Sequence, residues 1–500
     1  MSAENYQYRR VSANWILLTL ASVVMVFALI VLIRREIAHP TSTQSNLVVY
    51  CAAGIRKPVE AAAKQYEKEY DVAIRLDYGS TGELESKIAL EQENKAPRCD
   101  LYIPADQFFS DRARNRGLTK GAIPLAQFRV VLAVKPDSTL RIKSIRDLLS
   151  QNLSYVICNE QAGVGNRTQS ALKARDLWEE VFRNKKSSFP RVPEAANAVK
   201  TSDDIQAAFI WDATARQFGL KTIECPELAT GIATISADVT AQTAKTKEAL
   251  HFARYLAAPE KGKPFFKQFH FETLPGDPWE EVPELVIYCG GVKHNALVGT
   301  FTDFGKQGGC LIKTQYAGCG TIVGNIKARK FHLPDMFMTC DANYMDRVSS
   351  DLMEASDGSS NKVVIMVRRG NPKNIRSLLD LVQPDVSIGT TGPKLSTLSA
   401  LSWQMFEEAG IKEQMEKHQS VIVTTPTAHE SVLQMEGYTK LDAALIYEAN
   451  CQKLTKRFDL IRIDLPTAKT VQNTVAGKQS RHLQASNDRY QRRQAAVSAL

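Results

Sequence analysis

The sequence predicts an α/β protein built as two tandem copies of one unit, and three observations support this prediction. First, short β-branched runs alternate with helix-like segments, which is typical of a mostly parallel sheet. Second, residues 47–54 (LVVYCAAG) reappear as residues 285–292 (LVIYCGGV). Third, later blocks recur in the same order, so that residues 207–213 (AAFIWDA) match residues 443–449 (AALIYEA). The unit is about 235 residues long, a period that excludes a solenoid.

The composition is that of an ordinary globular chain, because 44% of the residues are hydrophobic and 23% are charged. The net charge of +9 is spread along the chain. The densest basic pairs, Lys185-Lys186 and Arg492-Arg493, have no aromatic residues interleaved with them. This pattern favours a solvated basic surface over a nucleic-acid interface.

The N-terminal region predicts a membrane anchor. After a polar segment, 1–14, residues 15–33 form a run of nineteen without a charge, and arginines stand on both sides of it. Such a run is long enough to span a bilayer. No small-x-small cleavage signal follows it, so we expect an uncleaved helix rather than a signal peptide, with a polar linker at 34–46.

The first unit is expected at 47–275. Its apolar runs predict strands and its amphipathic segments predict helices. After the first strand at residue 47, further strands are expected at 72–76, 99–104, 128–134, 155–158 and 207–211. Helices are expected at 59–70, 83–91, 169–182 and 243–256, with a short one reaching about 269.

The second unit is expected at 285–466, after a linker at 276–284. Besides the two blocks above, Gly82 matches Gly320, the pair Cys99-Asp100 is matched to Cys340-Asp341, and 130–134 to 363–367. The remaining residues, 467–500, are polar and basic, and we expect them to be mobile or loosely helical.

The nine cysteines contain no CxxC pair, so zinc-ribbon and thioredoxin-like spacings are absent from the sequence. Cys51, Cys99, Cys289 and Cys340 stand in strand-like runs, which favours buried thiols. Disulfides in an oxidising compartment are the open alternative.

No catalytic motif is present: the sequence lacks GxSxG, HExxH and a Walker lysine motif, and its eight histidines show no ligand spacing. We therefore expect no enzyme activity, no cofactor and no bound metal. Loops rich in small residues follow three strands, at 52–54, 79–82 and 162–166, and each opens a helix. Converging helix N-termini form an anion site without Lys or Arg. The alternative is that these loops only cap their helices.

The ordered blocks resemble the periplasmic molybdate-binding protein family, the solute-binding components of ABC importers. The resemblance rests on the Gly-Ser-Thr-Gly loop at 79–82, the block at 99–106 (CDLYIPAD), the strand at 128–136, the block at 207–213 and the segment 256–271. It covers 47–272 well and 285–466 more loosely. It implies two tandem units of the type II periplasmic-binding-protein fold, each with two α/β lobes that clamp a ligand between them.

The resemblance also implies site residues. The expected ligand-binding positions are Ala53, Gly54, Ser80, Thr81, Val164 and Trp211 in the first unit, and Cys319 and Tyr447 in the second. A serine of the family's first turn is replaced by Gly54 and by Val292, so one hydroxyl donor is missing from each site.

The function implied is capture of molybdate, tungstate or a similar small oxyanion, which is then passed to an ABC permease and ATPase. The units would lie in the periplasm, anchored in the inner membrane by a single helix. The alternative is a membrane-anchored sensor or scaffold that kept the fold without a transport role.

Overall fold

The computed structural model describes residues 46–328, 333–348, 350, 352, 355–391, 396–417, 421–425, 441–451, 454, 456–469 and 471–477. The expected membrane anchor at 15–33 and most of the expected tail lie outside these residues. Within the described ranges, no helix combines the length and the apolar character needed to cross a membrane.

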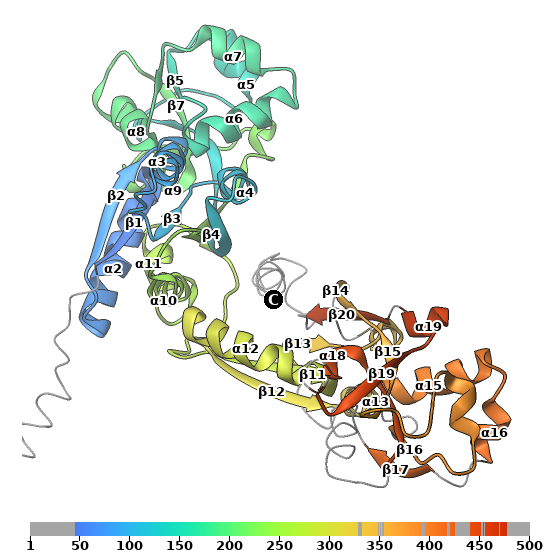
Figure 1. Ribbon diagram of the computed structural model, residues 1–500. Helices are drawn as coiled ribbons and strands as arrows, with labels where there is room; N and C mark the ends of the chain where they lie inside the picture. The colour runs from blue at the N-terminus through green and yellow to red at the C-terminus, as the bar shows by residue number, and fades with distance from the viewer. Residues whose placement is uncertain are drawn as a thin grey trace, which may run out of the picture.

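The first unit consists of two α/β lobes that share a long strand (Figure 1). In the first lobe, the first three strands along the chain are parallel neighbours. A later long strand, β9 (Ile232–Thr240), pairs antiparallel with the third of them, and the other long strand, β4 (Thr119–Val134), pairs antiparallel with β9. The sheet order is β2 (Ile74–Gly79), β1 (Leu47–Ala52), β3 (Leu101–Ile103), β9 and β4. The carboxyl ends of the parallel strands therefore face one edge of this lobe.

Strand β4 continues into the second lobe, where it pairs antiparallel with β7 and β8. The order there is β4, β7 (Ala207–Trp211), β5 (Tyr155–Cys158) and β6 (Ser187–Phe189), with β8 (Lys221–Ile223) on the other side of β4. The last two of the ordered strands run parallel to β7. Because β4 belongs to both lobes, it is the natural hinge between them.

Helices cover both lobes. Around the first lobe lie α2 (Arg56–Tyr70), α3 (Thr81–Glu93), α4 (Gln107–Asn115), α10 (Thr246–Ala257) and α11 (Lys263–Gln268). Around the second lie α5 (Ile145–Ser150), α6 (Gly163–Lys173), α7 (Trp178–Asn184), α8 (Val192–Thr201) and α9 (Asp212–Gln217).

The sequence of α2 shows why such helices form. Val59, Ala62, Ala63 and Tyr66 are buried, and their spacing of three and four residues puts them on one face. The helix ends at Asp71, whose φ of 52° is the left-handed conformation that terminates many helices.

Two sequence expectations for this unit need correction. The helix expected at 169–182 is two helices, α6 and α7, because the chain turns between them at Asp176, where φ is 56°. The strand expected at 128–134 is the second half of β4, which begins at Thr119. Strand β9, which lies between β3 and β4, was not anticipated.

The second unit repeats the strand order of the first. One sheet has the order β12 (Leu311–Ala317), β11 (Glu284–Gly290), β13 (Met336–Met338), β20 (Val471–Gly477) and β14 (Ser356–Asn361). The other has the order β17 (Val421–Thr425), β16 (Ile388–Thr391), β18 (Ala443–Tyr447), β15 (Val363–Arg368) and β19 (Phe458–Arg462). The helices include α12 (His294–Gly308), α13 (Cys319–Lys327), α14 (Ala342–Asp346), α15 (Thr397–Glu408), α16 (Lys412–Glu416), α18 (Glu448–Cys451) and α19 (Pro466–Lys469).

The repeat has two differences in detail. The counterpart of β4 is divided into β14 and β15, which belong to different sheets. Strand β20 pairs antiparallel with β13 and β14. The sequence places residues 471–477 in a polar tail, but here they form an inner strand of the sheet. Their backbone pairs with β13 on one side and with β14 on the other.

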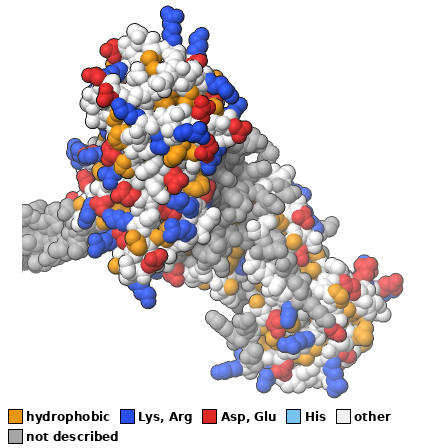
Figure 2. Space-filling model, turned by 90° about the horizontal axis from the view of Figure 1, so that it is seen from above, with side chains coloured by type: hydrophobic (Ala, Val, Ile, Leu, Met, Phe, Trp, Pro, Cys, Tyr) orange, Lys and Arg blue, Asp and Glu red, His pale blue; other side chains and the backbone are white. Residues whose placement is uncertain are grey.

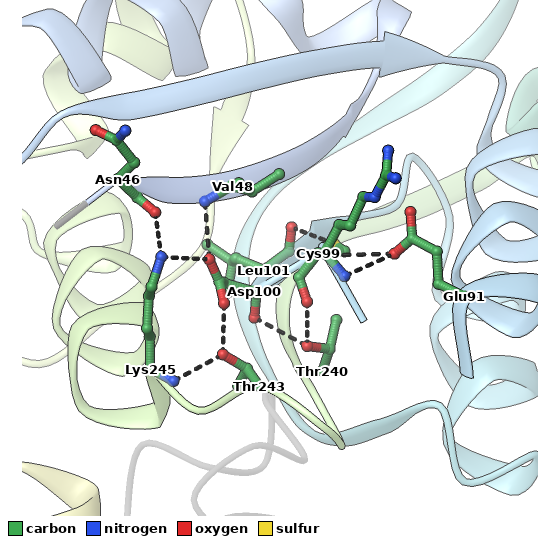
Figure 3. Close-up of polar contacts among 10 residues, drawn as sticks. Asn46, Val48, Glu91, Cys99, Asp100, Leu101, Thr240, Thr243 and Lys245 are labelled. Atoms are coloured by element: carbon green, nitrogen blue, oxygen red, sulfur yellow. Dashed lines mark hydrogen bonds and ion pairs between the residues drawn. The ribbon is translucent and has the colours of Figure 1, made fainter. Parts of the chain in front are cut away.

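The start of each unit is fixed by an aspartate, and this contact corrects the alignment of the repeats. The Asp100 carboxylate accepts a hydrogen bond from the backbone of Val48 at 2.9 Å (Figure 3). Asp335 accepts the same bond from Val286 at 3.0 Å. Asp100 therefore corresponds to Asp335. The matching of Cys99-Asp100 to Cys340-Asp341 was wrong, because identical dipeptides occur at different structural positions.

Asp341 instead corresponds to Asp106. Each is the N-cap of the helix that follows, accepting a hydrogen bond from the backbone of Asn343 or Phe108 at 2.9 Å. All nine cysteines are free thiols, and only Cys310 is partly exposed.

Candidate functional site

Six of the residues expected in the first unit line one small cavity between its lobes. The cavity has a volume of about 20 Å³. It lies where strands β1, β2 and β5 end and their helices begin. The lining residues include Ala53, Gly54, Ser80, Thr81, Val164 and Trp211.

The turn after β1 is shaped by Gly54. A Cβ atom at this position would lie 2.8 Å from Cγ1 of Val192 and 3.5 Å from Cδ1 of Trp211. The first distance is shorter than a real Cβ contact allows. A side chain at this position therefore requires Val192 to move, whereas the Trp211 indole would lie at an ordinary van der Waals distance.

The N-terminus of α3 supplies the second group of donors. Ser80 caps the helix together with Glu83, and both residues bond reciprocally to each other's backbone. The Thr81 hydroxyl accepts a hydrogen bond from the backbone of Ala105 at 3.4 Å, which leaves its proton free to donate. Tyr102 fixes the same turn by donating to the Thr81 carbonyl at 2.9 Å.

The N-terminus of α6 supplies the third group of hydrogen-bond donors. Gly163 and Val164 are its first residues, so their N–H groups have no acceptor inside the helix. Gly165 allows the turn to close, because a Cβ atom there would lie 1.9 Å from the carbonyl oxygen of Asn159. The partial positive charge of the helix end favours an anion at this point.

Trp211 closes the cavity from the end of β7. Its side chain is 1% exposed and stacks on Phe128, with ring centroids 3.9 Å apart. Its indole nitrogen would be 3.8 Å from a Cβ atom at Gly54. The indole N–H is its only hydrogen-bond donor, so Trp211 contributes mainly an apolar wall.

Polar contacts hold the two lobes together around this cavity. Gly82 of α3 donates its N–H to the carbonyl of Gln161 at 2.8 Å. Arg167 of α6 donates to the Asp106 carboxylate at 2.8 Å. Burial raises the pKa of Asp106, while the neighbouring guanidinium acts in the opposite direction. The structure therefore shows the closed arrangement of the lobes.

In the second unit, the two expected residues, Cys319 and Tyr447, lie close together and beside a second thiol, that of Cys340. Cys319 is the first residue of α13, as Thr81 is of α3. The backbone of Cys340 donates to its sulfur at 3.2 Å, which repeats the bond from Ala105 to Thr81. Tyr447 ends β18 as Trp211 ends β7, and it lies close enough to both thiols that their charges help burial to raise its pKa.

The Cys319 thiol differs from the other buried thiols. Hydrogen bonding from Cys340 is the main cause that lowers its pKa, and Thr397 and Lys293 act in the same direction against burial. Burial instead raises the pKa of Cys51 and Cys289.

Comparison with known proteins places this geometry in a family. A family model described as "Bacterial extracellular solute-binding protein" matches residues 47–272 and again residues 285–488. The chain belongs to this family. Two separate matches also agree with the repeated strand order.

Individual relatives of this solute-binding protein are distant. The molybdate-binding protein ModA of Mycobacterium bovis is 24% identical over 214 residues, covering 41% of this chain and 75% of that protein. A Haemophilus influenzae protein named "Putative binding protein" is 23% identical over 118 residues, and the match spans 24% of this chain and 46% of that protein. Among solved structures, the periplasmic molybdate-binding protein of Azotobacter vinelandii has a TM-score of 0.38 at 19% identity, covering 46% of this chain and 99% of that one.

Sequence reasoning missed several residues of the first cleft of this solute-binding protein. Ala105, Pro190 and Arg191 also line the cavity, whereas Gly163 belongs to the loop 162–166 that the sequence had marked. Arg191 follows the short strand β6, which has no clear apolar pattern. The proline at 190 could have indicated a loop after a strand, and loops in that place were already expected to bind the ligand. Arg191 pairs with Glu83 of the other lobe at 3.4 Å.

Proposed function

We propose that this protein is an extracytoplasmic receptor that captures a small oxyanion, of the molybdate or tungstate type, in the cleft of its first unit. The observation that carries this proposal is the convergence of three helix N-termini on one buried cavity. Backbone N–H groups of α6, the Thr81 hydroxyl and the turn at Gly54 all face it. The likeness to the ModA relative supports the same class of ligand.

The lining favours an anion over a cation. No carboxylate lines the cavity, and the charged side chain nearest to it is the guanidinium of Arg191. Neutral donors hold an oxyanion by direct hydrogen bonds, each about 1.5–3 kcal/mol when one partner is charged. Oxygen ligands for a hard cation would require carboxylates at these positions.

Binding requires the lobes to separate first. A cavity of about 20 Å³ holds a water molecule but not a tetrahedral oxyanion. An entering oxygen would replace the Gln161 carbonyl as acceptor for the N–H of Gly82, whose present distance is 2.8 Å. Strands β4 and β9, which connect the lobes, would bend to permit this opening.

Delivery of the ligand would involve the partners of an ABC importer, a permease and an ATPase. Residues 15–33 would anchor the receptor in the inner membrane, with both units in the periplasm. A sensor or scaffold without transport is the second candidate. The hydrogen bond between Gly82 and Gln161 favours this second candidate, because the Gly82 N–H already has an acceptor in the closed cleft without a ligand.

Isothermal titration of the full chain with molybdate, tungstate, sulfate and phosphate tests the proposal. We expect saturable binding of at least one tetrahedral anion and weaker binding by Thr81→Ala. Thr201→Ala is the matched control, since its hydroxyl also contacts backbone, at Asn197, but lies on the surface of α8. Absence of heat with all four anions would favour the scaffold instead.

A further inference from the structure

The second unit has two thiols where the first unit has a hydroxyl and a methyl group. Cys319 replaces Thr81, and Cys340 replaces Ala105. A Cβ atom added to Gly290 would lie 2.1 Å from the sulfur of Cys340 and 3.1 Å from that of Cys319. Both sulfurs therefore lie beside the same point, and only glycine leaves room for them.

One hydroxyl group beside these thiols has no hydrogen-bond partner among the described residues. It belongs to Tyr447, whose side chain is 2% exposed and lies close to both thiols. Thr397 is already hydrogen-bonded to the Cys319 thiol. A buried hydroxyl without a partner is costly. A bound molecule with its own hydroxyl would satisfy it.

We propose that this pair of thiols, Cys319 and Cys340, binds a trivalent metalloid oxyacid, the class to which arsenite belongs. Thiolate sulfur is a soft ligand and selects soft partners. In the described part of the chain, the pair is not joined by a third His, Cys, Asp or Glu that would complete a site for a metal ion. The oxyacid brings its own third ligand, a hydroxyl group, whereas a bare soft ion such as Cu(I) would leave the Tyr447 hydroxyl unpaired.

The binding step is a condensation without oxidation. Arsenous acid, As(OH)₃, forms two As–S bonds while two As–O bonds break. Each thiol proton leaves with one hydroxide as water, so two water molecules are released. The remaining As–OH group exchanges a hydrogen bond with the hydroxyl of Tyr447. The inference does not depend on anion binding by the first unit.

Native mass spectrometry of the reduced full chain with sodium arsenite tests this site. We expect one arsenic atom per chain, and protection of Cys319 and Cys340 from alkylation by N-ethylmaleimide after peptide mapping. Cys319→Thr, which installs the residue of the first unit, should weaken binding at least 100-fold. Cys310→Ser is the control, because this thiol of the same unit is partly exposed, and Arg254 rather than Cys319 or Cys340 acts on it.

A second variant separates chemistry from folding. Tyr447→Phe keeps both thiols and should weaken arsenite binding several-fold, with an unchanged thermal midpoint. Three results would overturn the proposal: no arsenic bound by the wild type, equal binding by Cys319→Thr, or binding of Cu(I) alone. Formation of a disulfide between Cys319 and Cys340 with diamide, without arsenite binding by the reduced chain, would also overturn it. Molybdate binding by the first unit, measured separately, has no bearing on these outcomes.

Discussion

Asp100 binds the backbone of Val48 at 2.9 Å and so ties the first strand of the unit to the loop before β3. The same carboxylate accepts a hydrogen bond from the Thr243 hydroxyl at 2.6 Å, and Lys245 lies 3.8 Å from it (Figure 3). One buried carboxylate thus joins the beginning of the unit to its last long helix. The second unit keeps the first of these contacts through Asp335.

Replacing Asp100 with alanine should destabilise the first unit. The change leaves the Val48 N–H and the Thr243 hydroxyl without their acceptor, which costs about 2–4 kcal/mol in total. Urea denaturation of the full chain measures this loss. Asp203→Ala is the control, because its ion pair with Lys135 is exposed to solvent and contributes little to stability. Equal effects of the two variants would contradict the assigned role.

Gly54→Ser should destabilise the first cleft, although the resemblance to molybdate-binding proteins implies serine at this position. The new side chain would lie too close to Val192, and such overpacking costs about 1–3 kcal/mol. The double variant Gly54→Ser with Val192→Ala should recover part of this loss. A double-mutant cycle gives the coupling energy. Strictly additive effects would show that the two positions do not share space.

Arg167→Met should destabilise the first unit far more than Arg191→Met. Arg167 pairs with Asp106, whose side chain is 0% exposed, so its removal leaves a buried carboxylate unpaired, at a cost of about 3–5 kcal/mol. Arg191 and Glu83 are both substantially exposed, and losing their contact costs about 0–1 kcal/mol. Thermal unfolding of the two variants side by side provides the comparison.

Asp238 makes stability depend on pH. Burial raises its pKa to about 7 from 3.8, and hydrogen bonds from Ser110, at 2.5 Å, and from Ser236 only partly oppose this rise. The folded state therefore keeps a proton that the unfolded state releases. The resulting stabilisation is complete below pH 4 and is lost as the pH rises through about 7.

Asp238→Asn isolates this effect. The stability of the wild type relative to this variant should fall between pH 4.5 and pH 8 in urea denaturation. Asp203→Asn is a control of opposite sign, because Lys135 lowers the pKa of Asp203 and that contribution is lost as the pH falls. A flat difference for Asp238→Asn would contradict the assignment.

The surface agrees with the composition. Figure 2 shows acidic and basic side chains interspersed over the described part of the visible face. This mixture fits the solvated surface expected from the spread of charge along the chain.

The sequence by itself determined the class of fold and the repeat. Buried strands such as β5 and β7 were predicted with the bounds they have, because their apolar runs are short and end in small residues. The loops at strand ends, 79–82 and 162–166 among them, were also marked from the chain alone, whereas Thr81 and Val164 as individual site positions came from the family resemblance. Helix N-termini after parallel strands meet at one edge, and this follows from topology rather than from side-chain contacts.

Only the tertiary structure decided the rest. Strand β20 was hidden in a polar stretch because its place depends on β13 and β14, which are distant in sequence. The true match of Asp100 is Asp335, since the contact with the first strand defines it and the neighbouring cysteines do not. Whether a small-residue turn leaves space for a ligand depends on what packs against it. Trp211 and Val192 fill the space beside Gly54, and Cys319 meets Cys340, because chain folding brings together residues that local patterns treat separately.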